Sequence, residues 1–175
     1  IYYLSPLVPL TDTHTWSVPS VEGNCPAARV GLSCSLISNT NLYFFGGYGV
    51  GLGYSNQTHL LDAALLSWTR PYMNGTPPSP RVGHTLTSVQ NRLFVFGGAF
   101  QGQPLRDLHV LDTETSCWSQ PHVVGVVPSS RFGHSAIALG GSLFVFGGCR
   151  RPNSSSGSSL RWMWECFRFR GRGSG

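Results

Sequence analysis

Three arginines of this chain begin the same short pattern, Arg-x-Gly, and their side chains could bind carboxylate groups. They are Arg29, Arg81 and Arg131, and they lie about fifty residues apart. A guanidinium presents a planar set of donors that pairs with a carboxylate through two bonds, and it stays charged when partly removed from water. In the alternative interpretation each arginine is structural and donates to carbonyl groups of neighbouring loops. The two interpretations are compatible.

Two histidines share a position in the same pattern and could bind a metal ion. His84 and His134 each stand three residues after an arginine of the pattern, and converging imidazoles are common metal ligands. The matching position in the first copy is Leu32, however, and no acidic residue recurs beside the histidines. We therefore predict packed structural rings, with no metal and no other cofactor. The other histidines occupy unrelated repeat positions in this interpretation, namely His14, His59, His109 and His122.

The arginine pattern belongs to a repeat with a period near 50 residues. Its other landmarks are a tryptophan (Trp16, Trp68 and Trp118) and a pair of glycines (Gly46 and Gly47, Gly97 and Gly98, Gly147 and Gly148). Each arginine follows its tryptophan by 13 residues. Independent landmarks that keep phase over three copies indicate one supersecondary unit used repeatedly, and this period is that of propeller blades.

The residues between these landmarks predict a four-stranded antiparallel blade. After Arg-x-Gly comes a run of small and apolar residues suited to a crowded inner strand, at 33–38, 85–89 and 135–139. A polar turn leads to an aromatic strand that is apolar on both faces, as in strands buried between two neighbours. The glycine pair ends this strand, where backbone or a large ring must approach closely. A third strand and a turn that begins at aspartate then lead to the tryptophan on a short outer strand.

This order of residues resembles the kelch repeat. The resemblance covers residues 23–149, and it rests on Arg-x-Gly-His, on the aromatic strand with its glycine pair, and on Asp followed by Trp. It implies a closed propeller of about six or seven blades in the complete family members, which act mostly as platforms for protein binding. Kelch propellers that capture acidic peptides carry arginine at the Arg-x-Gly position, which implies the same role for Arg29, Arg81 and Arg131.

The predicted fold is an all-β, kelch-type β-propeller fragment of about three four-stranded antiparallel blades that do not close. Its predicted parts are the end of a preceding blade at 1–18, blades at 19–69 and 70–119, the first half of a blade at 120–149, and a Ser/Gly linker with an Arg/aromatic tail at 150–175. An open array exposes apolar faces and strand edges. We therefore expect a fragment of a longer protein, or an incomplete gene product, that self-associates.

The tail at 150–175 allows several interpretations. It could supply a strand that completes the last blade, in which Leu160-Arg161 echoes Leu105-Arg106. It could instead be a sequence unrelated to the fold, or a disordered end. Aromatic residues interleaved with arginine can also stack on single-stranded nucleic acid.

The net positive charge of the chain lies in the tail at 150–175. The chain has 12 basic residues, all of them arginine, and 7 acidic ones, for a net charge of +5. Residues 1–149 carry six of each sign and are neutral, so the blades are no basic platform and nucleic acid is disfavoured as their partner. Five cysteines without metal-ligand spacing favour a reducing, cytoplasmic location. The sequence shows no signal peptide and no membrane span.

The resulting functional prediction is a non-enzymatic protein-interaction module, a scaffold or a substrate-recruiting platform. Partners are expected on the loop face around Arg29, Arg81 and Arg131, with Tyr48, Tyr54 and Phe100 in neighbouring loops as further contacts. An acidic peptide fits the arginines, and replacing Arg81 and Arg131 would then weaken binding without loss of the fold. No small-molecule substrate and no membrane partner are expected. The alternatives are the propeller part of a galactose-oxidase-like copper enzyme, whose residue set is not assembled here, and a nucleic-acid contact through the tail.

Overall fold

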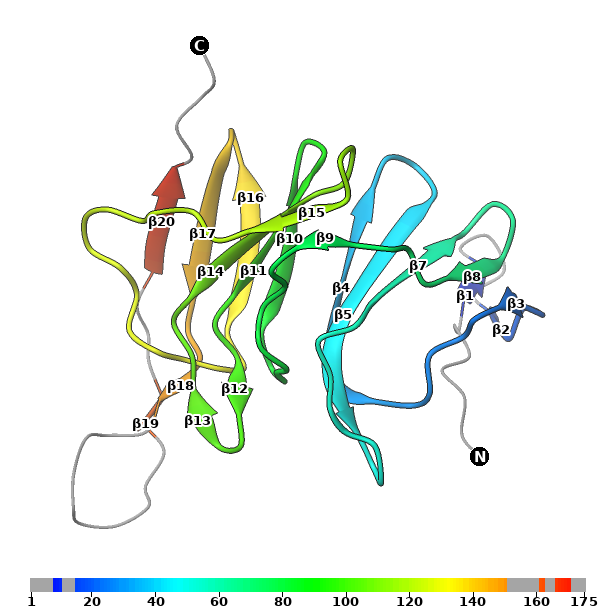
Figure 1. The fold of residues 1–175 in the computed structure, drawn as a ribbon, viewed down its shortest axis with the longest axis horizontal. Helices are drawn as coiled ribbons and strands as arrows, with labels where there is room; N and C mark the ends of the chain where they lie inside the picture. The colour runs from blue at the N-terminus through cyan, green and yellow to red at the C-terminus, as the bar shows by residue number, and fades with distance from the viewer. Residues whose placement is uncertain (1–7, 11–14, 151–160, 163–165, 171–175) are drawn as a thin grey trace.

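The structure is a computed structural model, and it describes residues 8–10, 15–150, 161–162 and 166–170. Every regular element among these residues is a β-strand. Three larger sheets stand side by side in the order of the sequence, with β1 and β2 at one end of the row and β20 at the other (Figure 1). In this part of the chain no helix is long and apolar enough to cross a membrane. The fold is the open, all-β array of blades that the repeat predicts.

The first sheet contains the first copy of the repeat. Its strands pair in the order β3-β8-β7-β5-β4, and β6 pairs with the end of β5. Four of them form an antiparallel blade, whereas β3 is a short additional strand that pairs parallel to β8. The bounds are β3 (Glu22–Gly23), β4 (Val30–Ile37), β5 (Asn41–Gly49), β6 (Gly53–Tyr54), β7 (Thr58–Asp62) and β8 (Ser67–Thr69).

The second sheet repeats this plan. Its order is β10-β11-β14-β15-β9, with β9 parallel to β15 and the other pairs antiparallel. A hairpin of two short strands, β12 and β13, follows β11. The bounds are β9 (Asn74–Gly75), β10 (Thr85–Val89), β11 (Arg92–Phe96), β12 (Ala99–Phe100), β13 (Gln103–Pro104), β14 (Leu108–Asp112) and β15 (Cys117–Ser119).

The third sheet contains three strands in the order β16-β17-β20. A hairpin of β18 and β19 follows β17, and β1 and β2 form a separate hairpin near the N-terminus. The bounds are β16 (Ser135–Leu139), β17 (Ser142–Phe146), β18 (Cys149–Arg150), β19 (Arg161–Trp162), β20 (Cys166–Arg170), β1 (Val8–Leu10) and β2 (Thr15–Ser17).

The tail supplies the third strand of the third sheet, because β20 pairs antiparallel with β17. The expected echo of Leu105-Arg106 in Leu160-Arg161 is wrong, however. Trp162 pairs with Cys149 as Pro104 pairs with Ala99, so Trp162 and not Leu160 takes the place of Pro104. Arg161 therefore lies inside the hairpin, opposite the residue that matches Phe100, whereas Arg106 follows its hairpin. The linker at 151–160 lies outside the described residues.

The glycines of the Arg-x-Gly pattern join neighbouring sheets. The N–H of Gly83 donates to the carbonyl of Gly31 over 2.9 Å, and the N–H of Gly133 donates to the carbonyl of Gly83 over 2.8 Å. All three have a φ near +63°, between 62° and 65°, which favours glycine. The inner strands β4, β10 and β16 therefore start side by side along one line.

The glycine pair makes room for the next sheet. A Cβ on Gly46 would lie 2.6 Å from Cε1 of His84 and 2.8 Å from the carbonyl oxygen of Arg81. On Gly97 it would lie 2.7 Å from the carbonyl oxygen of Arg131. Because these distances are below any real Cβ contact, glycine at the strand end is what lets the following Arg-x-Gly-His segment pack against it.

The hydrophobic core lies between the sheets rather than inside one of them. The cluster between the first and second sheets contains Ile37, Tyr43, Phe45, Leu86, Leu93, Val95, Leu111 and Trp118. The cluster between the second and third sheets contains Phe96, Leu108, Leu143 and Val145. Each sheet is therefore stabilised chiefly by the apolar faces of its neighbours.

Candidate functional site

The short hairpins that follow the glycine pairs all lie at one end of the sheets, which we call the hairpin end. They are the β5–β6 hairpin, the β12–β13 hairpin and the β18–β19 hairpin, at the lower edge of Figure 1. The tight turns between β4 and β5, between β10 and β11 and between β16 and β17 lie at the opposite end. Loops carried by a rigid sheet scaffold are the usual location of binding residues.

The three aromatic residues that were expected in the loops come together at the hairpin end. The ring centroids of Tyr48 and Tyr54 are 5.0 Å apart, and those of Tyr54 and Phe100 are 5.2 Å apart, both with edge-to-face geometry. This aromatic cluster joins the hairpins of the first and second sheets, and Val50 and Leu52 on the same hairpin are exposed. The cluster therefore offers a partly apolar contact surface.

Arg81 lies inside the protein, where it joins two parts of the second sheet. Its side chain is 0% exposed. The Nη1 atom donates to Oδ1 of Asp107 over 2.8 Å and to the carbonyl of Gly97 over 2.9 Å, and Nη2 donates to Oδ2 of Asp107 over 2.7 Å. Further bonds go to the carbonyl and the hydroxyl of Ser79. The fold brings Asp107, the residue just before β14, to Arg81, so this arginine has a carboxylate partner that the repeat pattern did not indicate.

Arg131 repeats most of this arrangement in the third sheet, whereas Arg29 does not. Arg131 is also 0% exposed, and it donates from Nη1 to the carbonyl of Gly147 over 2.8 Å and from Nε to that of Ser129 over 3.1 Å. Arg29 is half-buried, and its Nη2 lies 3.5 Å from Oε1 of Gln57. A direct role of the three arginines in partner binding stays a prediction.

Asp107 links Arg81 to a histidine. Nε2 of His109 lies 3.0 Å from Oδ2 of Asp107. Burial alone would raise the pKa of Asp107, but the hydrogen bonds from His109 and Arg81 outweigh it and hold this pKa well below its usual range. The carboxylate is therefore charged at all physiological pH values. Arg81 and His109 are buried, and the half-buried Asp107 joins them into one network.

His59 and His109 occupy the same repeat position, so the sequence-based statement that their positions are unrelated is wrong. His59 pairs with Phe44 in the first sheet, and His109 pairs with Val95 in the second. Their separation equals the repeat period, which was the signal that could have revealed them. Burial, followed by the charge of Arg29, lowers the pKa of His59 to about 4.

His84 and His134 are packed between neighbouring sheets. Each ring stands edge-on to an aromatic ring of the preceding sheet, Phe45 or Phe96, with centroids 5.4 Å apart in both cases. Burial lowers the pKa of His84 to about 3 and that of His134 to about 4, with the charges of Arg81 and Arg131 as the next cause. Both imidazoles are thus neutral at pH 7. Within the described ranges no group of three or more His, Cys, Asp or Glu side chains could hold a metal ion.

A cleft lined by two arginines lies between the β12–β13 and β18–β19 hairpins. Its volume is about 610 Å³, and its lining residues are Pro104, Leu105, Arg106, Asp107, Ser129, Ser130 and Arg150. Arg106 is exposed, and Nε of Arg150 is buried with no hydrogen-bond partner in the described part of the chain. We call this feature the arginine cleft. Sequence reasoning missed it, because two arginines 44 residues apart share no repeat position and meet only through the fold.

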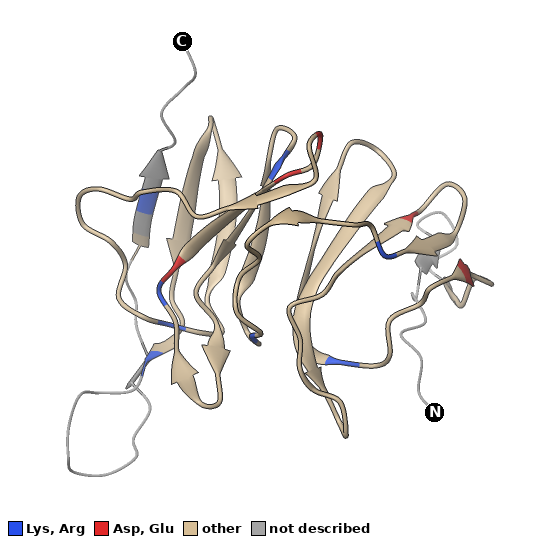
Figure 2. Cartoon of the chain, viewed as in Figure 1, with Lys and Arg blue, Asp and Glu red and all other residues tan. Residues whose placement is uncertain are grey.

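Charged residues are distributed unevenly between the hairpin end and the opposite end of the molecule. Arginines gather near the hairpin end, whereas acidic residues lie mostly near the opposite turns (Figure 2). Asp62 accepts backbone N–H bonds in the turn between β7 and β8, and Asp112 does so in the turn between β14 and β15, so both carboxylates already have partners. The hairpin end is therefore the more positive one, and it would attract acidic groups over a distance set by the ionic strength.

Antiparallel blades stacked on a common line of glycines define an open β-propeller. A family model described as the KLHDC2/KLHL20/DRC7 Kelch-repeats domain matches residues 7–166, so the chain belongs to the kelch-repeat family.

Named relatives show the same repeat. The chain is 39% identical over 89 residues to the Rab9 effector protein with kelch motifs of Bos taurus, a match that covers 50% of this chain and 24% of that protein. It is 39% identical over 88 residues to Kelch domain-containing protein 3 of Bos taurus, covering 50% and 23%. It is 40% identical over 79 residues to the Rho GTPase-activating protein gacHH of Dictyostelium discoideum, covering 45% and 5%. The matched part of the chain thus spans about a quarter of the first two relatives.

Proposed function

We propose that this chain is a non-enzymatic protein-interaction module that acts in the cytoplasm as a scaffold or a recruiting platform. Its partner would be an acidic peptide segment that binds at the hairpin end. One of the relatives is named as an effector of Rab9, and that name supports a role in protein binding for the family member concerned. The observation that carries the proposal is the arginine cleft, in which Arg106 and Arg150 line the same opening.

The cleft suits a carboxylate because it combines charge with additional donors. Arg150 has a buried Nε with no partner in the described residues, and Ser130 lines the same opening. Hydrogen bonds from a guanidinium to a carboxylate are among the stronger polar contacts in proteins. The aromatic cluster on the adjacent hairpins would hold apolar side chains of the same peptide.

The buried arginines enter this proposal as positioning residues. Arg81 holds Asp107 and Arg131 holds the carbonyl of Ser129, and both of these held residues line the cleft. Arg29 is half-buried, unlike the fully buried Arg81 and Arg131, and remains a candidate for direct contact with a partner. The mouth of the cleft is thus shaped by side chains that the partner does not need to touch.

Peptide binding tests the proposal directly. We expect a labelled library of Asp- and Glu-rich decapeptides to bind more tightly than the matched Asn and Gln library. Replacing Arg106 and Arg150 together by alanine should weaken binding about tenfold or more, which corresponds to roughly 1.4 kcal/mol. Fluorescence anisotropy at low and high salt measures both effects, and the difference should shrink as salt screens the charges.

Arg92 provides the matched control. It is an exposed arginine near the turns at the opposite end, where it contacts Asp112. Arg92→Ala should leave peptide affinity unchanged. Equal losses in the Arg92 variant and in the double variant, or equal binding of the charged and neutral libraries, would show that the cleft is not the recognition site.

A further inference from the structure

The first copy of the repeat has the same arginine position as the second copy, but different residues surround it. In the second copy the carboxylate of Asp107 pairs with Arg81, and all side-chain partners of Arg81 lie between Ser79 and Asp107, within one copy. The carbonyl of Asp107 accepts a bond from the N–H of the first glycine of its pair, and in the first copy the carbonyl of Gln57 accepts the matching bond. Gln57 therefore stands where the second copy has Asp107.

Arg29 has neither the carboxylate nor the hydroxyl group that hold Arg81. Its Nη2 atom lies 3.5 Å from Oε1 of Gln57, which is a long contact. Ala27 stands where the second copy has Ser79. The Nε atom of Arg29 is buried without a hydrogen-bond partner, and no Asp or Glu of the described residues forms an ion pair with this arginine. The positions that serve Arg81 are thus all present in the first copy, but their side chains leave the charge of Arg29 uncompensated.

A second arginine adds positive charge at the same place. Arg70 follows β8, where the second copy has Gln120. Burial lowers the pKa of Arg29, and the charge of Arg70 lowers it further. Burial, followed by the charges of both arginines, also lowers the pKa of His59 to about 4, so this ring is neutral at pH 7. The surroundings of Arg29 therefore combine two positive charges, whereas the second copy pairs its arginine with a carboxylate.

A small cavity lies beside these side chains. Its volume is about 10 Å³, and Arg29, Gln57 and His59 line it together with Gly46 at the end of the aromatic strand. A cavity of this volume holds one particle of about the size of a water molecule. A carboxylate group is larger than this, whereas a chloride ion is a single atom only slightly larger than water. Water itself would leave the arginine charge without a counter-charge, and buried charges in proteins are normally paired.

We propose that the first sheet binds a chloride ion between Arg29, Gln57 and His59, in the role that Asp107 has in the second sheet. The ion would accept hydrogen bonds from the guanidinium of Arg29 and from the amide of Gln57. A guanidinium is weakly hydrated and therefore suits a partly buried ion pair. Because the ion would bind only the folded chain, it would stabilise the fold in proportion to its occupancy. This inference is independent of the proposed peptide binding, since none of these residues lines the arginine cleft.

Urea unfolding of the purified chain in different sodium salts tests the inference. We expect the urea midpoint to rise, and then to level off, as chloride replaces gluconate at constant ionic strength. Both salts screen charges equally, but gluconate is too large for the cavity. Acetate, whose carboxylate is also too large, should behave as gluconate does. Equal midpoints in chloride and gluconate, or an equal rise in acetate, would overturn the chloride site.

Gln57→Asp tests the equivalence of the ion and the carboxylate. The variant gives Arg29 the partner that Arg81 already has in Asp107. We expect it to be more stable than the wild-type chain in gluconate, and to bind chloride at least about tenfold more weakly, because its own carboxylate takes the place of the ion. Full retention of the chloride effect in this variant would contradict the proposal.

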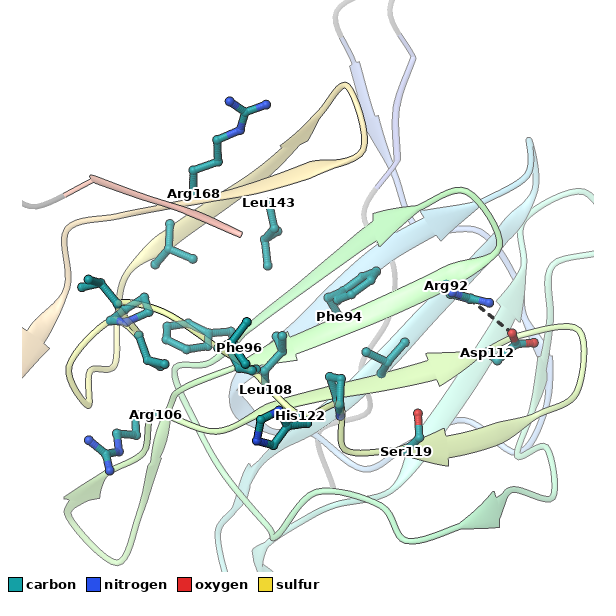
Figure 3. A pocket seen from close by; sticks show the side chains of 18 residues that line it. Arg92, Phe94, Phe96, Arg106, Leu108, Asp112, Ser119, His122, Leu143 and Arg168 are labelled. Atoms are coloured by element: carbon teal, nitrogen blue, oxygen red, sulfur yellow. Dashed lines mark hydrogen bonds and ion pairs between the residues drawn. The ribbon is translucent and has the colours of Figure 1, made fainter. Parts of the chain in front are cut away.

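Arg29→Gln removes the charge at the site, and Arg92→Gln is its matched control. Arg92 is an exposed arginine that already pairs with Asp112, as the dashed line in Figure 3 shows. We expect Arg29→Gln to lose the chloride effect and Arg92→Gln to keep it. A similar loss in both variants would mean that chloride acts on the overall positive charge of the chain rather than at one site.

Chlorine NMR detects the bound ion directly, because exchange with a protein site broadens the chloride signal. The wild-type chain and Arg92→Gln should broaden the signal, whereas Gln57→Asp and Arg29→Gln should not. Since Gln57→Asp is expected to be the more stable chain, its lost broadening cannot be ascribed to unfolding. Equal broadening by Gln57→Asp and by the wild-type chain would show that chloride does not bind beside Gln57.

Discussion

Replacing Arg81 with leucine is expected to lower the free energy of unfolding by about 3–5 kcal/mol, which is the usual effect of removing one partner from a buried ion pair. The guanidinium is fully buried and makes two short bonds to Asp107. Without it, the carboxylate of Asp107 would remain mostly buried, with His109 as its remaining charged or polar side-chain partner among those described. This geometry reverses the sequence-based expectation that arginine substitutions at this position leave the fold intact.

Urea denaturation of matched variants measures this effect. Arg92→Leu is the control, because the Arg92–Asp112 pair is long, at 3.4 Å, and largely exposed. Such surface pairs contribute less than about 1 kcal/mol. The double variant Arg81→Leu, Asp107→Leu should recover part of the loss, since it leaves no buried charge. Equal midpoints for Arg81→Leu and Arg92→Leu would show that the buried network does not stabilise the sheet.

The sequence predicted the sheets well because their determinants are local and repeated. The glycine pair, the aromatic strand and the tryptophan recur in phase, and each marks a place where backbone or a ring packs tightly. Gly46 and Gly97, for example, both face the Arg-x-Gly-His segment of the next sheet. The short parallel strands β3 and β9 were not predicted, since two paired residues leave no periodic pattern.

The candidate site was predicted only in part, because it depends on contacts between different copies of the repeat. The aromatic residues Tyr48, Tyr54 and Phe100 were recognised one by one as loop residues, and the structure joins them into one cluster. Asp107 was not recognised as the partner of Arg81, because the matching residue in the first copy is Gln57, an uncharged residue that faces Arg29. A repeat search finds what copies share, whereas a binding site often depends on where they differ.

The second large effect that we expect is a loss of stability in mild acid. His84 and His134 have pKa values of about 3 and about 4 in the folded protein, because burial disfavours their charged forms. In the unfolded chain both would titrate near the ordinary value of 6.5. As the pH falls below 6.5, the unfolded state therefore binds protons that the folded state does not, and the folded state loses stability. The loss continues until the pH reaches the folded values.

The pKa of the buried His59 is lowered in the same way, to about 4, so three histidines contribute. The expected slope is roughly 1.4 kcal/mol per pH unit for each buried histidine, or about 4 kcal/mol per unit for the three together between pH 6 and pH 4. Asp107 acts in the same direction only at lower pH, because its lowered pKa contributes stability that is present above the unfolded value near 3.9 and lost below it. The histidine effect and the carboxylate effect are therefore separated along the pH axis.

Urea midpoints measured from pH 7 to pH 4 test this expectation, and leucine is the informative replacement because Leu32 occupies the same position in the first copy. His84→Leu and His134→Leu should each remove about a third of the slope, with His59 supplying the rest, even though His134→Leu also loses the contact of the ring with Oγ1 of Thr85, 3.0 Å away. His122→Leu, at an exposed position, should leave the slope unchanged. A wild-type stability that stays level between pH 6 and pH 4 would mean that the two rings are protonated in the folded state. That result would require the packing against Phe45 and Phe96 to open, because a charged imidazole cannot remain between these sheets without solvent or a counter-charge.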